Sequence, residues 1–359
     1  MINQITITDF RNHVSTRIKI GDAKNIIITG LNGAGKTAIL EAISLLSGER
    51  GLRGVETQTM ARFNGNGGFS VFATTIDETD ICVFLNPDEK NRHAKIDNEN
   101  VALAELAKKL RIVWLTPRED RIFVESVSDR RAFFDHLVAN FEPSHIGRIT
   151  RLNKLLSERA GALKSNADNN WLDAIDKQIA ATAIAVGAGR IKYAGEINYF
   201  FERGAVSVDG MIERLIVENT AIDAEQKYFE YLQNNRALIG DKMTIDGAHK
   251  SDFGVFDKIL NLPANITSTG QQKSILIDLI LAHAKLIHIK TGQKPLILLD
   301  EAAAHLDENA RNKLFAELND ADAQVWATGL DKTVFQNIPR AIFVTCQDGR
   351  ISNIVESEK

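Results

Sequence analysis

Hydrophobic and polar residues alternate near the start of the chain, as they do in strands that bury one face. The pairs Ile5/Ile7 and Ile18/Ile20 each place two apolar side chains on one strand face. Residues 25–29 form a short apolar run of strand length. These patterns predict two half-buried strands followed by a buried strand.

The pattern changes twice further along the chain. Residues 38–46 have helical spacing, and apolar residues recur at helical rather than strand spacing over residues 117–236. Further strands are expected at residues 68–85, 296–299, 324–328 and 341–346. We therefore expect one α/β domain, residues 1–116 and 237–359, which is interrupted by a mostly helical insertion at residues 117–236.

One helix of the predicted insertion has a basic side. At one hundred degrees per residue, its apolar positions gather on one face, and its basic positions gather on the other. The apolar positions are Ile149, Leu152, Leu156, Ala160 and Leu163, and the basic positions are Arg148, Arg151, Lys154 and Arg159. This face is either a solvated surface or a surface for DNA, and the pattern alone leaves both open.

Composition limits the class of protein. The net charge of −4 argues against a nucleic-acid partner when read globally, yet residues 108–164 carry twelve basic and seven acidic residues, a local balance of +5. Two cysteines are too few for a disulfide framework. No apolar stretch is long enough to span a bilayer, and no secretory signal is visible. We expect a cytoplasmic protein without a membrane partner.

A phosphate-binding loop follows the strand at residues 25–29. Residues 30–37 match G-x-x-x-x-G-K-[ST] in full, between a strand and a helix. Glycines allow the loop to point amide groups at phosphate oxygens, Lys36 reaches the β- and γ-phosphates, and the Thr37 hydroxyl can ligate Mg²⁺. The residues expected to bind nucleotide are Gly30, Asn32, Gly33, Ala34, Gly35, Lys36 and Thr37. The sequence thus predicts a site for ATP and Mg²⁺.

Two further motifs belong to the same chemistry. The apolar strand at residues 296–299 ends in Asp300, which is expected near Mg²⁺, and in Glu301, which is placed to activate a water for attack on the γ-phosphate. Residues 268–273, Ser-Thr-Gly-Gln-Gln-Lys, open a helix as a second potential anion-binding turn. Because Lys36 already lies in the first phosphate cradle, the second cradle suggests a phosphate bound in another subunit.

The order of these motifs resembles that of ABC-type ATPases, and finer details resemble the RecF family of bacterial recombination and gap-repair ATPases. The stretches that carry the resemblance are residues 10–12, 114–117, 129–135, 247–252, 268–273 and 298–307. The blocks at 129–135 and 247–252 are the most specific, because a generic ABC ATPase does not need them. The resemblance covers the chain nearly end to end and implies an ABC-type P-loop head with a mixed sheet, flanking antiparallel strands and an inserted lobe.

The resemblance also implies a mechanism. ATP would be bound between two heads of a homodimer, with Ser268, Gly270 and Asp307 acting across the interface and Arg11 and Asn12 near the nucleotide. Members of the family bind double-stranded and gapped DNA, act with RecR and RecO, assist loading of the RecA recombinase, and hydrolyse ATP slowly.

Some features depart from the wider pattern. The strand at residues 324–328 is followed by no switch histidine, so Thr328 or Asp331 is a candidate for a related role, and Lys250 stands where much of the family has Arg. An ABC-transporter ATPase subunit is one alternative, although Lys36 and Ser268 lie 232 positions apart (268 − 36). Another SMC-like chromosome-maintenance ATPase is a second alternative, although residues 117–236 lack the heptads of a long coiled coil.

Overall fold

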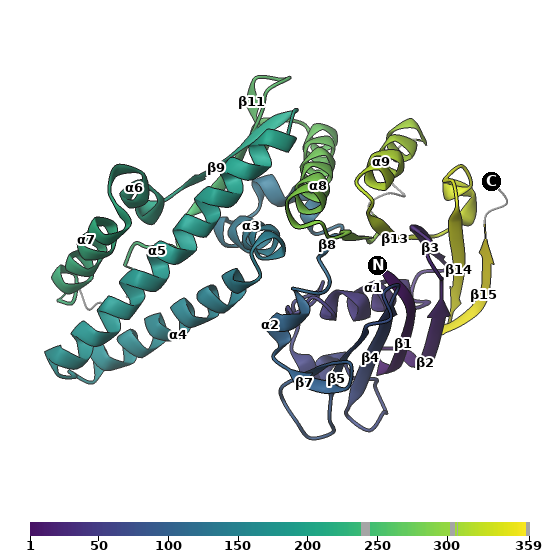
Figure 1. Cartoon of the computed structure of the whole chain (residues 1–359), viewed down its shortest axis with the longest axis horizontal. Helices are drawn as coiled ribbons and strands as arrows, with labels where there is room; N and C mark the ends of the chain where they lie inside the picture. Colours follow the sequence, from purple (N-terminus) through teal and green to yellow (C-terminus); the bar gives the residue numbers. More distant parts are fainter. Residues whose placement is uncertain (238–244, 302–305, 307, 357–359) are drawn as a thin grey trace. The chain divides into compact units, whose positions relative to one another are not determined.

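The computed structural model describes residues 1–237, 245–301, 306 and 308–356 (Figure 1). The chain divides into two compact units. The head comprises Met1–Arg121 and Leu276–Lys359, and the lobe comprises Ile122–Ile275.

The head contains a six-stranded sheet in the order β15-β14-β3-β13-β12-β8. Its strands are β3 (Asn25–Thr29), β8 (Ile112–Leu115), β12 (Leu296–Leu299), β13 (Gln324–Gly329), β14 (Ala341–Gln347) and β15 (Arg350–Glu356). All neighbouring strands are parallel except the pair β14 and β15. Strands β3, β8, β12 and β13 are buried at every residue, which explains why at least three apolar residues follow one another in each.

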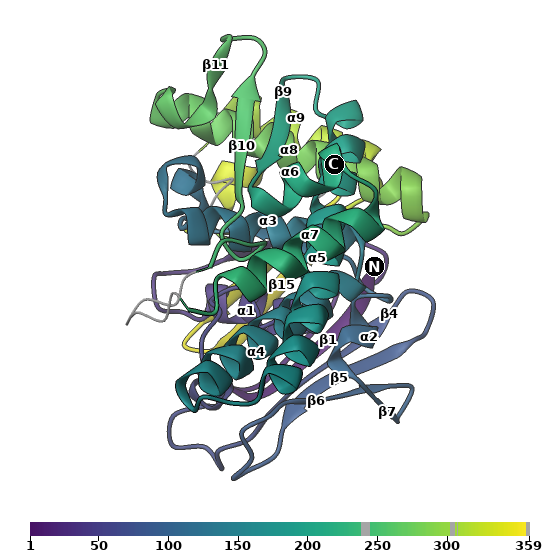
Figure 2. The same ribbon diagram turned by 90° about the vertical axis from the view of Figure 1, so that its left-hand side faces the viewer.

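The second sheet of the head is antiparallel, in the order β2-β1-β4-β5-β6-β7. Its strands are β1 (Ile2–Phe10), β2 (His13–Lys19), β4 (Phe69–Thr75), β5 (Asp80–Leu85), β6 (His93–Ile96) and β7 (Glu99–Val101). Figure 2 shows β4 to β7 as a blue ribbon layer. Burial alternates along β4 and β5, so one face of this sheet is covered.

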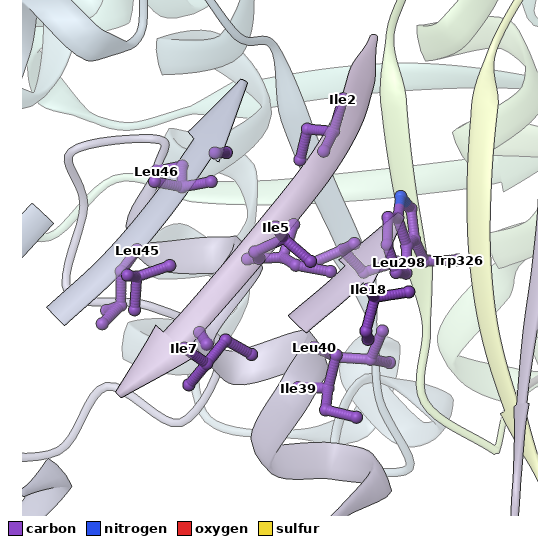
Figure 3. Packing of buried hydrophobic residues seen from close by; sticks show 14 of the residues in the cluster. Ile2, Ile5, Ile7, Ile18, Ile39, Leu40, Leu45, Leu46, Leu298 and Trp326 are labelled. Atoms are coloured by element: carbon purple, nitrogen blue, oxygen red, sulfur yellow. The ribbon is translucent and has the colours of Figure 1, made fainter. Parts of the chain in front are cut away.

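Helix α1 (Lys36–Leu45) contacts β1 and β4 of the antiparallel sheet and β8 and β13 of the parallel sheet. It therefore lies between the two sheets. Figure 3 shows Ile39 and Leu40 of this helix in the same core cluster as Ile5, Ile18 and Trp326. All five side chains are fully buried, and each stabilises the fold by about 1.5–3 kcal/mol through apolar burial.

A buried glutamine joins the two sheets of the head. Gln324 Oε1 accepts from the amide of Ile2 at 2.9 Å, and Gln324 Nε2 donates to the carbonyls of Ile2 at 2.8 Å and Ala23 at 2.9 Å. Since Ile2 begins β1 and Gln324 begins β13, the Gln324 side chain satisfies backbone groups at the start of a strand of the other sheet.

The lobe is mostly helical. Its helices are α3 (Val127–Phe141), α4 (Ser144–Lys164), α5 (Asn169–Phe200), α6 (Met211–Glu218) and α7 (Ala221–Asn234). Helix α5 packs against α4, α6 and α7 around a core that includes Leu152, Ile179 and Tyr228. A small antiparallel sheet is formed by β9 (Gly204–Asp209), β10 (Asp252–Asp257) and β11 (Leu262–Pro263).

Three further helices complete the main elements. Helix α2 (Leu103–Leu106) and α9 (Glu308–Asp320) belong to the head, and α8 (Thr269–Thr291) begins in the lobe and ends in the head. Short 3-10 turns lie at Thr57–Met60, Glu119–Val124, Ala264–Ile266 and Lys332–Phe335.

The predicted fold class, a mixed α/β head with an inserted and mostly helical lobe, is confirmed. The predicted strands are observed, and the strand expected at residues 25–29 has the same bounds in the structure. Strand β9 lies inside the stretch expected to be helical, because it pairs along its whole length with β10. The compact units divide at Arg121 and Ile275. The domain limits at 117 and 236 stay predictions.

Candidate nucleotide-binding site

The carboxyl ends of three parallel strands place the predicted motifs at one edge of the sheet. Strand β13 lies between β3 and β12, so the loop after β3, Thr328 of β13 and Asp300 after β12 lie side by side. A cavity of about 530 Å³ opens at this edge. Its lining residues are Arg11, Asn12, Asn32, Gly33, Gly35, Lys36, Thr37, Ala38, Arg53, Thr59, Ala61, Phe63 and Glu301.

The phosphate loop wraps around the ammonium group of Lys36. Lys36 Nζ donates to the carbonyls of Gly30 at 2.8 Å and Leu31 at 3.0 Å, and the residue is only 5% exposed. Gly30 has a φ of 151°, and a Cβ there would lie 2.2 Å from the carbonyl oxygen of Cys346. A side chain at this position is therefore excluded by both backbone conformation and space.

Three side chains form a polar group beside Lys36. Asp300 Oδ1 accepts from Thr37 Oγ1 at 3.0 Å and from Thr328 Oγ1 at 2.9 Å. Burial raises the pKa of the Asp300 carboxyl, Glu301 also raises it, and the two hydroxyls oppose the shift. A hydroxyl and a carboxylate oxygen this close fit the oxygen ligands that Mg²⁺ prefers.

Glu301 lies on the wall of the same cavity. Its backbone has a φ of 55°, a left-handed conformation that costs roughly 1–3 kcal/mol in a residue with a side chain. The amide of Glu301 donates to Thr328 Oγ1 at 2.8 Å, which holds the strained turn. Of the two candidates to replace the switch histidine, Thr328 thus contacts both Asp300 and Glu301, whereas Asp331 accepts from the amide of Thr333.

Arg11 and Asn12, which the family resemblance places near the nucleotide, line the cavity. The partner of Arg11 could not be predicted from the sequence. Arg11 donates to both carboxylate oxygens of Glu41, at 2.8 and 2.6 Å, and Glu41 is fully buried on α1. Arg53 Nη1 approaches the same carboxylate at 3.8 Å. Glu41 therefore orients two arginines on the cavity wall.

Two further lining residues of the cavity, Thr59 and Phe63, were not predicted from the sequence. The Phe63 side chain is 86% exposed. In the structure, an exposed aromatic side chain beside a polar cavity marks such a position, but exposure cannot be seen in the sequence.

The signature turn belongs to the lobe. The amide of Ser268 donates to Gln271 Oε1 at 2.9 Å, and the amide of Gln271 donates to Ser268 Oγ at 3.4 Å, as in a helix capping box. Ser268 and Gly270 are exposed at the start of α8. All residues lining the cavity come from the head, and Asp307 lies outside the described residues.

The interpretation of the helix at residues 148–163 as a fully basic outer face is wrong at one position. Arg159 is buried, and its Nε donates to Asp176 at 2.6 Å because α5 and α7 cover that side of α4. Arg148 pairs with Glu142 at 2.6 Å. Arg151 and Lys154 remain exposed.

The two family-specific blocks contact each other within the lobe. Arg130 Nε donates to Asp252 Oδ1 at 2.8 Å, and Arg131 Nη1 donates to the carbonyl of Ser251 at 3.0 Å. Asp135 accepts from Arg190, whose Nη1 donates to the carbonyl of Ala248 at 2.6 Å. The first block thus fixes the second block through charge-assisted hydrogen bonds.

None of the helices in the described part of the chain combines the length and apolarity needed to cross a membrane.

These elements define a P-loop ATPase head interrupted by a helical lobe. The family model described as "RecF/RecN/SMC N terminal domain" matches residues 1–353. The chain is 35% identical to the "DNA replication and repair protein RecF" of Allorhizobium ampelinum and 33% identical to that of Mesorhizobium japonicum. The alignments cover 98% of this chain in both cases, and 98% and 97% of these two relatives. The chain therefore belongs to the RecF family, as its motifs indicated.

Solved structures agree on the fold. "Structure of the recombination mediator protein RecF-ATPrS in RecFOR pathway" matches with a TM-score of 0.83 at 20% identity, covering 98% of this chain and 97% of that one. An SMC head domain derived from Pyrococcus furiosus matches with a TM-score of 0.52 at 16% identity, covering 99% and 96%. The ABC/SMC-like head expected from the sequence is confirmed.

Proposed function

We propose that this protein is an ATP-dependent DNA-binding protein of recombinational repair and replication-gap processing. The observation that carries the proposal is the convergence of Lys36, Thr37, Asp300 and Glu301 on one cavity edge in a member of the RecF family. The relatives are named DNA replication and repair proteins, and a solved RecF structure is described as a recombination mediator with ATP.

Nucleotide binding is assigned to the phosphate loop and its neighbours. The loop amides and Lys36 would bind the β- and γ-phosphates of ATP, and Arg11 and Asn12 would lie beside the nucleotide. Thr37 and Asp300 would hold Mg²⁺, which neutralises charge on the phosphates when bound.

Hydrolysis is assigned to Glu301. Its carboxylate would accept a proton from a water aligned with the γ-phosphate, and Thr328 would hold the turn that presents it. Phosphoryl transfer asks for positioning and charge neutralisation rather than covalent chemistry, which suits a slow ATPase that acts as a switch.

ATP would join two copies of the chain. Ser268 and Gly270 of one copy would contact the γ-phosphate held by the other copy, with Asp307 in the same interface. The exposed start of α8, with the Ser268 hydroxyl and the positive end of the helix dipole, suits an anion brought by a partner.

The dimer would bind double-stranded and gapped DNA, act with RecR and RecO, and assist loading of RecA. The contact between residues 129–135 and residues 247–252 supports this assignment over a transporter ATPase, because both blocks were recognised as specific to the RecF family. ATP release or hydrolysis would then open the dimer and free the DNA.

Mixing two inactive variants tests the composite site. Lys36→Ala removes the phosphate cradle, and Ser268→Arg blocks the signature, so neither homodimer should hydrolyse ATP. A mixed dimer carries one intact Lys36 cradle facing one intact Ser268, so an equimolar mixture should recover about a quarter of wild-type ATPase activity. No recovery, with both variants folded and the mixed dimer detected by sedimentation, would contradict action in trans.

A further inference from the structure

Three consecutive carbonyl groups of the phosphate loop, those of Gly33, Ala34 and Gly35, contact hydrogen-bond donors outside the loop. The carbonyl of Gly35 lies 3.1 Å from His13 Nε2. The carbonyl of Ala34 accepts from the amide of Gly349 at 2.9 Å. These partners lie outside the loop: His13 is the first residue of β2, and Gly349 lies in the turn between β14 and β15.

Two weaker contacts extend this support. Asn12 Nδ2 donates to the carbonyl of Gly33 at 3.4 Å, and the Cys346 thiol donates to the carbonyl of Ala34 at 3.1 Å. The loop therefore rests on neighbouring segments through its carbonyl oxygens, which leaves its other side for a ligand.

Holding a carbonyl fixes the direction of the next amide. The peptide unit is planar and trans, so the carbonyl of Gly35 and the amide of Lys36 point in opposite directions. The same relation links the carbonyl of Ala34 to the amide of Gly35. Neither amide donates to another backbone group in the described structure, and both lie at the start of α1, where phosphate is favoured.

His13 is built into this support. It is fully buried, its Nδ1 lies 2.8 Å from Thr16 Oγ1, and a Cβ on Gly35 would lie 2.6 Å from its Nε2. Burial lowers the pKa of its imidazole, which favours the neutral ring at physiological pH. A carbonyl oxygen only accepts, so the contact with Gly35 requires a proton on Nε2. On the other side of the ring, Thr16 Oγ1 lies 2.8 Å from Nδ1 and donates to the carbonyl of Gly349 at 3.3 Å.

We propose that His13 is a positioning residue for the phosphate loop: its imidazole Nε2–H holds the Gly35 carbonyl and thereby aims the amide of Lys36 at the triphosphate. The proposal rests on the nucleotide-binding function proposed above. Because the Gly35 carbonyl also accepts from the amide of Ile39 at 3.2 Å, His13 connects the loop to the first turn of α1.

Two substitutions of His13 distinguish the effect of its hydrogen-bond donor from the effect of its size and shape. His13→Leu keeps an apolar side chain of similar size but has no donor, whereas His13→Gln places an amide N–H near the position of Nε2. We expect His13→Leu to weaken binding of both ADP and ATP roughly tenfold, and His13→Gln to bind within about threefold of wild type. His93→Leu, at an exposed histidine outside the cavity, is the matched control and should bind as wild type does.

The test titrates fluorescent ADP and ATP analogues into each full-length variant and records thermal unfolding without nucleotide. Weak binding in His13→Leu with recovery in His13→Gln supports the proposal, and the recovery excludes a purely structural effect. Wild-type affinity in folded His13→Leu, or equally weak binding in folded His13→Gln, overturns it. Lys36→Ala separates the two proposals: if it binds nucleotide normally, the nucleotide site itself is wrong, whatever His13 does.

Discussion

The buried ion pair between α4 and α5 predicts an unequal effect of removing either partner. Asp176 is fully buried and accepts from Arg159 Nε at 2.6 Å and from Arg236 Nη2 at 2.6 Å. Arg159 also donates to the carbonyl of Leu232 at 2.7 Å. Arg236 is partly exposed and has a second carboxylate partner, Asp173, at 2.6 Å.

The magnitudes follow from what each substitution leaves behind. Asp176→Leu leaves Arg159 buried with one carbonyl partner, so it should lower the free energy of unfolding by about 3–5 kcal/mol. Arg159→Met leaves Asp176 paired with Arg236 and should cost about 1–3 kcal/mol, mainly through the unpaired carbonyl of Leu232. The double variant removes both charges and should cost less than the sum of the single variants.

Urea unfolding measures these differences. Trp171 is the only tryptophan between residues 122 and 275, so its emission reports on the lobe, and circular dichroism follows the whole chain. Equal losses for Asp176→Leu and Arg159→Met, or a double variant that is less stable than the sum, would refute the reasoning. The same ion pair determines which substitutions can test DNA binding by the helix α4. Arg159→Glu should unfold the lobe, so a test by charge reversal should use the exposed residues Arg151 and Lys154.

Three further substitutions and one control substitution test the head. Asp300→Asn should raise the melting temperature at pH 7, because burial raises the pKa of the Asp300 carboxyl and the ionised form opposes folding. The gain in melting temperature should disappear below about pH 4, where the carboxyl is protonated in both states. An unchanged melting temperature at pH 7 would contradict this account of Asp300. Gly30→Ala should abolish nucleotide binding and cost more than about 2 kcal/mol in unfolding free energy, because its Cβ meets the carbonyl of Cys346. Gly33→Ala, at a φ of 80° with open space around it, is the milder control at roughly 1 kcal/mol, and equal losses in calorimetry would contradict the steric account. Gln324→Leu should lower the free energy of unfolding by about 3 kcal/mol or more, because buried backbone groups lose their partners; a loss below about 1 kcal/mol would show that water replaces the side chain.

Much of the head could be predicted because its signals are local. The strand at residues 25–29 is buried on both faces, and its three central residues are therefore apolar one after another. The glycines of the phosphate loop are required by backbone conformation, and that requirement is visible in the sequence.

The features that could not be predicted from the sequence depend on contacts between residues that are distant along the chain. Strand β9 forms only because β10 pairs with it, more than forty positions later. Glu41 is a charged residue on an apolar helix, and nothing near it reveals that Arg11 will bind it. Arg159 was placed on an outer face because helical periodicity cannot show that a neighbouring helix covers that face.

The residue types of the candidate site could be predicted from the sequence, but their contacts with one another could not. The types and order of Lys36, Thr37, Asp300 and Glu301 followed from the chemistry of phosphate and Mg²⁺. The left-handed backbone of Glu301 and the contact of Thr328 with Asp300 could not be predicted without the neighbouring strand β13.

The most direct test of the central claim is sedimentation velocity of the full-length protein with a fluorescent gapped DNA duplex. It should be measured with Mg²⁺ and either a slowly hydrolysed ATP analogue or ADP, and with Lys36→Ala as the control. The account predicts a DNA complex containing two protein copies with the ATP analogue only, and none with ADP or with Lys36→Ala. An equal amount of complex with the analogue, with ADP and without nucleotide would contradict the claim that ATP controls DNA binding through the dimer.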